Sequence, residues 1–156
     1  MADGVIPDLG ELYLAEVIQD TFNTGAGGWT PTLYLYKNDY TPVAGSDVGD
    51  FTEADFPGYS RNELNNWSTP TTDDDGNALM TDALHLYEME DVSPTNTVYG
   101  YLIALPDVGG DPDRIVGAVR FDEPVEMNAV GAQLTVLPVL KFKNCVIAIE
   151  SGTGSV

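Results

Sequence analysis

The sequence predicts a mainly β protein, an antiparallel sandwich or barrel with one α-helix at its N-terminus. Roughly six or seven short segments have strand-like patterns, and turns rich in glycine, proline and acids separate them. Only the first segment has helical periodicity, so strands do not alternate with helices as they do in parallel doubly wound sheets. With 156 residues, 43% of them hydrophobic, we expect a single domain over residues 1–150 and a flexible tail over 151–156.

The predicted helix spans about residues 7–22 and ends before the glycine-rich stretch GAGG (25–28). Asp8 and Glu11 place negative charge at its start, where the helix dipole favours it. The apolar stripe at helical spacing consists of Leu14, Val17, Ile18 and Phe22, widened by Leu9 and Tyr13. Such a stripe is typical of a helix that packs on a core.

From about residue 32 onward the pattern is that of strands. TLYLYK (32–37) alternates and is rich in aromatic residues, and a long irregular stretch (38–59) follows it. TVYGYLIAL (97–105) has the pattern of a buried strand that pairs with RIVGAVRF (114–121). The other predicted strands are 61–68, which is ambiguous, and 82–89, 133–143 and 144–150; turns or connections are predicted at 71–77, 106–113 and 123–133.

Two of these strands have a clear alternation. In 82–89, Leu84 and Leu86 fall on one side and His85 and Tyr87 on the other. In 133–143, one face carries Leu134, Val136, Leu140 and Phe142. Pro138 lies inside this second strand, which predicts an edge position or a bulge because proline has no N–H to donate.

The charge balance restricts the partners. Asp and Glu number 25 against six Lys and Arg, which gives a net charge of −19. Such a surface repels nucleic acid and anionic membranes, because both are bound through basic residues. Basic protein surfaces and divalent cations are the natural partners, although the charge also has the simpler interpretation that it keeps the protein soluble.

The single cysteine excludes an intramolecular disulfide. Cys145 lies in the apolar run CVIAI, so we expect a buried structural thiol. The first residues have neither a basic start nor an uninterrupted apolar stretch, which argues against a signal peptide, and no apolar run is long enough for a transmembrane helix. These observations predict a soluble protein made in a reducing cytoplasm.

Motifs for catalysis or metal binding are weak. His85 lies in an alternating strand with no nucleophile motif elsewhere, and one Cys with one His is too few for a usual zinc site. DDDG (73–76) has acids like those of a calcium loop, but Thr71 and Asp82 occupy its strongest ligand positions, so a hairpin turn is the better interpretation and calcium stays open. GAGG lacks the lysine and spacing of a phosphate loop. We expect no catalytic residue, no metal site and no cofactor.

Aromatic residues crowd the first half of the strand region: Trp29, Tyr34, Tyr36, Tyr40, Phe51, Phe56, Tyr59 and Trp67. Trp and Tyr carry binding energy at protein contacts and stack on sugars, but the sequence does not show which side these rings face. A long irregular stretch inside a compact domain is usually functional or disordered, and its aromatic residues argue for order. They either pin the stretch to the chain's own core or dock into a neighbouring subunit. The predicted partner interface is Phe51, Phe56, Tyr59, Trp29 and Trp67.

The order of segments resembles a group of small virion proteins of tailed bacteriophages. The residues that carry the resemblance are LYLYKNDYTPVAGSDVGDFTEADFPGYSRNEL (33–64), TVYGYLIAL (97–105) and AVRFDEPVEMNAVGAQLTVLPVLKF (118–142). The resemblance implies a jelly-roll-like β-sandwich that acts as a head decoration or cement protein on the capsid exterior. It also implies the major capsid protein and other copies of this chain as partners, in a homodimer or homotrimer, and no enzymatic role.

Two other functions remain from the sequence. The first is a tail or fibre-associated module that binds a host surface or glycan, with Trp29 and Trp67 as its contact residues. The second is a small hydrolase that uses two carboxylates, because with 25 acids some pairs lie at suitable distances by chance.

Overall fold

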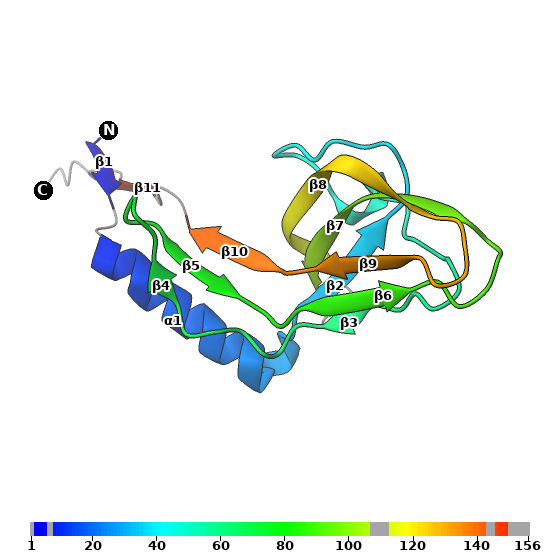
Figure 1. The fold of residues 1–156 in the computed structure, drawn as a ribbon. Coiled ribbons are helices and arrows are strands. Elements are labelled where there is room, and N and C mark those ends of the chain that lie inside the picture. Colours follow the sequence, from blue (N-terminus) through cyan, green and yellow to red (C-terminus); the bar gives the residue numbers. More distant parts are fainter. Residues whose placement is uncertain (1, 6–7, 107–112, 143–145, 150–156) are drawn as a thin grey trace, which may run out of the picture.

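The computed structural model describes the backbone of residues 2–5, 8–106, 113–142 and 146–149, and the side chains of 10–106 and 113–142. The described chain is mainly β with one helix, and its sheets are antiparallel, as predicted. The strands form four small sheets, so the strand arrangement does not confirm the predicted sandwich or jelly roll. Figure 1 shows the helix and a three-stranded sheet at one end of the molecule and a four-stranded sheet at the other. Cys145 and the predicted tail (151–156) lie outside the described residues.

Helix α1 (Asp8–Thr24) confirms the predicted helix, but not its buried face. Ala15 and Phe22 are buried and Ile18 partly so. The stripe was predicted too wide, because Tyr13, Leu14 and Val17 are 65%, 42% and 48% exposed. The physical reason is that α1 lies against the narrow sheet of β4 and β5, which covers only one strip of the helix.

The four-stranded sheet has the order β3-β2-β7-β8. Its strands are β2 (Thr32–Tyr36), β3 (Asn62–Glu63), β7 (Asn96–Leu105) and β8 (Arg114–Met127). The predictions for β2 and β7 are confirmed, and so is the pairing of β7 with the strand that follows it. The ambiguous strand at 61–68 shrinks to two residues.

Strand β8 runs further than predicted, so the expected connection at 123–133 is wrong over its first five residues. The register shifts between Val98 and Gly100, so the four residues 121–124 lie opposite Tyr99 alone. Pro124 lies in this irregularity on an edge strand, where its missing N–H leaves no ladder bond unmade.

A long two-stranded ribbon connects the two ends of the molecule (Figure 1). It pairs β5 (Ala78–Thr81) with β10 (Val139–Phe142), and then β6 (His85–Glu88) with β9 (Gln133–Val136). Strand β4 (Thr71–Thr72) adds to β5 and confirms the hairpin turn at 73–76. The predicted strand at 133–143 is interrupted at Pro138, whose carbonyl accepts a hydrogen bond from the Asp82 N–H at 3.1 Å. Leu134 and Val136 face the core as predicted.

The chain's two ends also pair with each other. Strand β11 (Val146–Ile149) confirms most of the last predicted strand, and it pairs antiparallel with β1 (Ala2–Val5), which the sequence did not predict. None of the helices that the structure describes is long and apolar enough to cross a membrane.

Hydrophobic side chains pack on both faces of the four-stranded sheet. The larger cluster contains Leu33, Leu35 and Ile103 and extends to Phe22, Phe56 and Trp67. The smaller cluster, on the alternate residues of β2 and β7, consists of Tyr34, Tyr36, Phe51, Leu102 and Ala104. Phe51 belongs to the irregular stretch, which therefore covers this second face of the sheet.

Candidate functional site

The irregular stretch 38–59 is tied to the end of β2 by backbone hydrogen bonds. Lys37 N–H donates to the Thr52 carbonyl at 2.8 Å, and Ala54 N–H donates to the Leu35 carbonyl at 2.9 Å. Tyr36 and Glu53 form an isolated antiparallel bridge between these two bonds. The stretch thus begins and ends beside the strand that precedes it.

Local capping and ring packing order the middle of the stretch. The short 3-10 helix Val48–Asp50 starts at Asp47, whose carboxylate accepts from Gly49 N–H at 2.7 Å, while the Asp50 carboxylate accepts from Asp47 N–H at 3.0 Å. Phe51 follows the helix, and its ring contacts those of Tyr36 and Tyr40 edge-on, each at 5.0 Å between centroids.

The end of the stretch is a tight turn that requires glycine. Tyr59 N–H donates to the Phe56 carbonyl at 3.0 Å, with Pro57 and Gly58 between them. Gly58 has a φ of +92°, as the third residue of a type II turn does. A Cβ at this position would lie 2.1 Å from the Glu88 carbonyl oxygen, so no larger side chain fits without movement.

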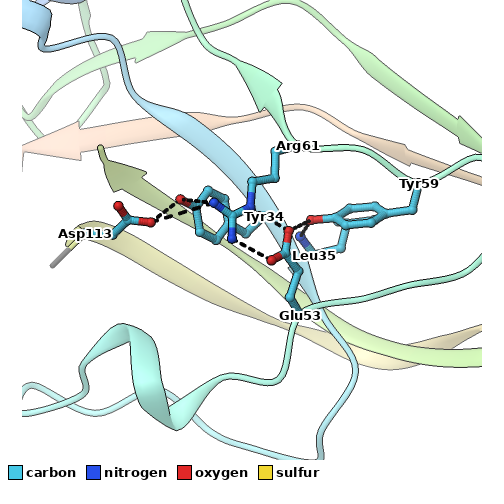
Figure 2. Close-up of polar contacts among 6 residues, drawn as sticks. All are labelled: Tyr34, Leu35, Glu53, Tyr59, Arg61 and Asp113. Atoms are coloured by element: carbon cyan, nitrogen blue, oxygen red, sulfur yellow. Dashed lines mark hydrogen bonds and ion pairs between the residues drawn. The ribbon is translucent and has the colours of Figure 1, made fainter. Parts of the chain in front are cut away.

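Beyond this turn lies a group of interacting polar side chains, which we call the Arg61 cluster: Tyr34, Glu53, Tyr59, Arg61 and Asp113 (Figure 2). The Arg61 guanidinium donates from Nε and Nη2 to the two Glu53 oxygens, each at 2.7 Å. Tyr59 donates its hydroxyl hydrogen to Glu53 at 2.9 Å and accepts from Leu35 N–H at 3.2 Å. Glu53, which belongs to the irregular stretch, thus contacts Arg61 just before β3, and its bridge to Tyr36 connects it to β2.

The other side of the cluster includes Tyr34 from β2. Arg61 Nη1 donates to the Tyr34 hydroxyl at 3.0 Å, and the guanidinium carbon lies 4.0 Å from the centroid of the Tyr34 ring. Tyr34 donates to the carboxylate of Asp113, the residue before β8. Arg61 therefore connects residues from three separate parts of the chain.

The pKa values follow from these contacts. Hydrogen bonds from Arg61 hold the pKa of Glu53 below its ordinary value of 4.5, against the opposing effect of burial. Burial raises the pKa of Tyr34, and the hydrogen bond to Asp113 raises it further. Burial likewise raises the pKa of Tyr59, with the Glu53 charge adding to it. At neutral pH the cluster contains an ionised Glu53, a charged Arg61 and two protonated tyrosines.

The hydrogen bonds of the cluster are made mostly among its own members. Its donors point at acceptors within the cluster, and Glu53 is ionised and accepts from both Arg61 and Tyr59. The hollow beside it, lined by Tyr34, Phe51 and Glu53 among others, measures about 70 Å³, well below the roughly 300 Å³ of a small ligand pocket. It fastens the irregular stretch to the sheet.

A larger hollow, about 440 Å³, lies between α1 and the ribbon. Ile18, Phe22 and Leu140 line it with other apolar residues. Lys141 provides its charged group, and this ammonium forms an ion pair with Asp73. Its described lining residues are otherwise apolar, whereas a ligand site orients its ligand with several convergent polar groups.

The five predicted interface residues do not form one surface. Phe51, Phe56 and Trp67 are 9%, 2% and 3% exposed, so their side chains belong to the chain's own core, one of the two alternatives that the sequence left open. Tyr59 is partly buried in the same core, and Trp29 is 38% exposed. Contact between the irregular stretch 38–59 and another subunit stays a prediction. The buried side chains of Phe51, Phe56 and Trp67 are not available for such a contact.

His85 has one hydrogen-bond partner among the described residues, the Asp82 carboxylate at 3.1 Å. Asp82 is 5% exposed and also accepts from the backbone N–H groups of Asn66 and Ala83. It therefore holds the segment 64–68 against the ribbon, and no hydrogen bond joins His85 to a nucleophile among the described residues.

The acidic turn is a hairpin held by Asp73. Its carboxylate accepts from the N–H groups of Asp75 and Asn77, at 3.0 and 2.9 Å, and pairs with Lys141. These contacts lower the pKa of Asp73 to about 2, with the Lys141 interaction as the largest cause. Within the described ranges, no group of three or more His, Cys, Asp or Glu side chains is placed to hold a metal ion.

Sequence reasoning missed the Arg61 cluster, although one signal for it was present. Basic residues are scarce in this chain, and a scarce cation among many carboxylates is expected to be paired. Lys37, Arg61, Arg120 and Lys141 each form an ion pair with a carboxylate. Comparison with family models, with curated proteins and with solved structures found no match to this chain.

Proposed function

We propose that this chain is a non-enzymatic decoration or cement protein that binds the outer surface of an assembled bacteriophage head and stabilises it. The observation that carries the proposal is the state of its charges. Lys37, Arg61, Arg120 and Lys141 are occupied by carboxylates of the same chain. Many of the remaining acids are exposed, among them Glu16, Asp74, Glu90 and Asp91, which suits a basic patch on a partner protein.

Some acids gather at one end of the molecule, which we call the acidic end: Asp55, Glu88, Glu90, Asp91 and Glu126. Asp55 pairs with Lys37, so the other four contribute to the surplus charge there. All five are exposed. Backbone hydrogen bonds bring their segments together, from Glu90 to Pro57 at 3.0 Å and from Met89 to Ala132 at 2.9 Å. Thr97 donates to Glu126 at 3.0 Å across β7 and β8.

Many copies on a symmetric shell bind with high avidity even when each contact is weak.

Two further points support this proposal. In the Arg61 cluster and in the pair of His85 and Asp82, polar side chains hydrogen-bond to one another, as is typical of contacts that hold a structural protein together. The sequence also resembles small virion proteins over most of its length. We include in the same proposal that the fold is a jelly-roll-like sandwich. The major capsid protein is the proposed partner.

The experiment is to compare heads that lack the protein with heads to which it is added back. We expect the temperature at which heads burst to rise on addition of the wild type. The variant E90Q/D91N should bind and stabilise less, because it removes two charges from the acidic end. The control D20N removes an exposed charge from α1 and should behave as the wild type. Heads that are equally robust with and without the wild type would refute the proposal.

A second candidate is a glycan-binding module carried on a tail or fibre. Its support is Trp29, which is 38% exposed and whose indole lies beside Gly27. Trp67 cannot contribute a stacking face, because its ring is buried against Phe22, with 6.2 Å between the ring centroids. Binding on a glycan array that W29A abolishes would favour this candidate, and a silent array would remove it.

A further inference from the structure

An exposed apolar strip runs along the outer face of the two-stranded ribbon. Its main members are Leu84, Leu86, Leu137 and Val139, which are 65%, 58%, 48% and 41% exposed. Exposed apolar residues that occur singly need no explanation, but a contiguous group usually marks a contact surface. We call this group the ribbon strip.

Strand geometry explains why these residues share one face. Met80, Tyr87, Leu134 and Val136 are buried in one core cluster, so they fix the inner face of the ribbon. The alternate residues of the same strands, among them Leu86 and Val139, must point the other way. Leu84 directly precedes β6 and Leu137 directly follows β9, and the exposure of both places them on the same outer side. Leu86 lies opposite Thr135, and Val139 lies opposite Thr81, so both strands contribute to the outer face.

Between its two ends the ribbon strip carries no acid, in a chain whose net charge is −19. Its outward positions on the second strand are Gln133, Thr135, Leu137, Val139 and Lys141. Among the outward-facing ribbon residues that the structure describes, charged groups occur at the two ends of the strip, and both are held within the chain. Glu88 accepts a hydrogen bond from Gln133 at 2.7 Å, and Lys141 pairs with Asp73.

We propose that the ribbon strip is the surface through which two copies of this chain associate around a two-fold axis. A basic partner would meet no carboxylate between the ends of the strip, so the strip does not suit the charge-driven contact described above. A second copy carries the same net charge of −19, and it can approach closely only where neither copy presents acids. The proposal rests on the fold and charges alone and does not depend on the proposed function.

The geometry of the strip suits an isologous contact. An antiparallel ribbon looks similar when rotated by half a turn, so its leucines can interleave with those of an identical ribbon. Two ribbons packed face to face would place their strands about 10 Å apart, as in the two layers of a sandwich. Each copy would then bury the outer face of its ribbon as well as the inner one.

The experiment is sedimentation equilibrium of the purified full chain over a range of concentrations and salt. The test variant is L86Q/L137Q, which leaves the net charge unchanged. Because both side chains are about half exposed, we expect it to fold, which circular dichroism and thermal unfolding would check. The matched control is V92Q/V130Q, which replaces two valines that are 65% and 60% exposed elsewhere on the surface.

We expect the wild type and the control to form dimers, and the test variant to dissociate roughly 30-fold more easily or worse, the size of effect found at interface hot spots. Dimerisation should tighten as NaCl rises from about 0.05 to about 0.5 M, because salt screens the repulsion between the two copies. Binding to heads through the acidic surface should weaken over the same range. Loss of head binding with dimers intact would count against the proposed function alone.

Three results would overturn the inference. The first is a wild type that stays monomeric at about 1 mM at every salt concentration, or that forms an assembly other than a dimer. The second is a dimer that survives L86Q/L137Q unweakened, whatever V92Q/V130Q does. The third is a monomeric wild type whose binding to heads is lost in L86Q/L137Q, which would assign the ribbon strip to the partner protein instead.

Discussion

Replacement of Phe56 by alanine should strongly destabilise the isolated chain. Phe56 is 2% exposed, and its ring lies 5.6 Å from that of Tyr59, measured between centroids. Truncation of a buried phenylalanine to alanine costs about 3 to 5 kcal/mol, because apolar contacts are lost and a cavity remains. A domain of this kind has a free energy of unfolding of about 5 to 15 kcal/mol, so the loss is a large fraction of the total.

The assay is equilibrium unfolding in urea followed by tryptophan fluorescence. Trp67 is 3% exposed in the folded chain, so its emission should shift when the core opens. With an m-value of about 2 kcal/mol per M, a loss of about 4 kcal/mol lowers the midpoint by about 2 M. The control V43A lies in the same irregular stretch but is 63% exposed, and it should change stability by less than about 0.5 kcal/mol.

A loss below about 1 kcal/mol for F56A would refute the reasoning. It would mean that the isolated chain does not use this ring to hold its core. The alternative, in which the irregular stretch docks its aromatic rings into a neighbouring subunit, would then regain support.

Two further predictions concern the Arg61 cluster and the turn before it. R61M should lower the free energy of unfolding by about 1 to 2 kcal/mol at neutral pH. The loss should be smaller than for a buried ion pair, because the Arg61 and Glu53 side chains are 49% and 33% exposed. The pKa of Glu53 is lowered on folding, so this stabilisation is present above about pH 4.5 and is lost as the pH falls through the folded pKa; the difference between R61M and wild type in urea should narrow there. G58A should cost about 2 to 4 kcal/mol, since its φ is +92° and its Cβ would meet the Glu88 carbonyl; an unchanged urea midpoint would contradict this.

The fold could be predicted from the sequence where the pattern is local. β2 and β7 were predicted because their runs are long, apolar and rich in β-formers. β1 was missed because ADGV has little strand character, and its partner β11 lies at the other end of the chain. The helix was predicted, but not its buried face, because the width of an apolar stripe does not show how much surface the neighbouring sheet covers.

The candidate site was less predictable for the same reason. Glu53 and Arg61 belong to irregular segments, and Asp113 comes after β7 in the sequence. No regular spacing in the sequence therefore connects the three residues. The burial of Phe51 and Phe56 was one of two alternatives, which only the path of the chain over the sheet decides.

The most direct test of the proposed function is a salt series of binding between the purified chain and empty heads, measured by cosedimentation. If the exposed acids bind basic patches on the shell, the affinity should fall steeply as NaCl rises from about 0.05 to about 0.5 M, because salt screens attraction between exposed charges. E90Q/D91N should bind more weakly than D20N at low salt and lose less affinity on going to high salt. Binding that does not change with salt, or no binding at low salt, would contradict the account.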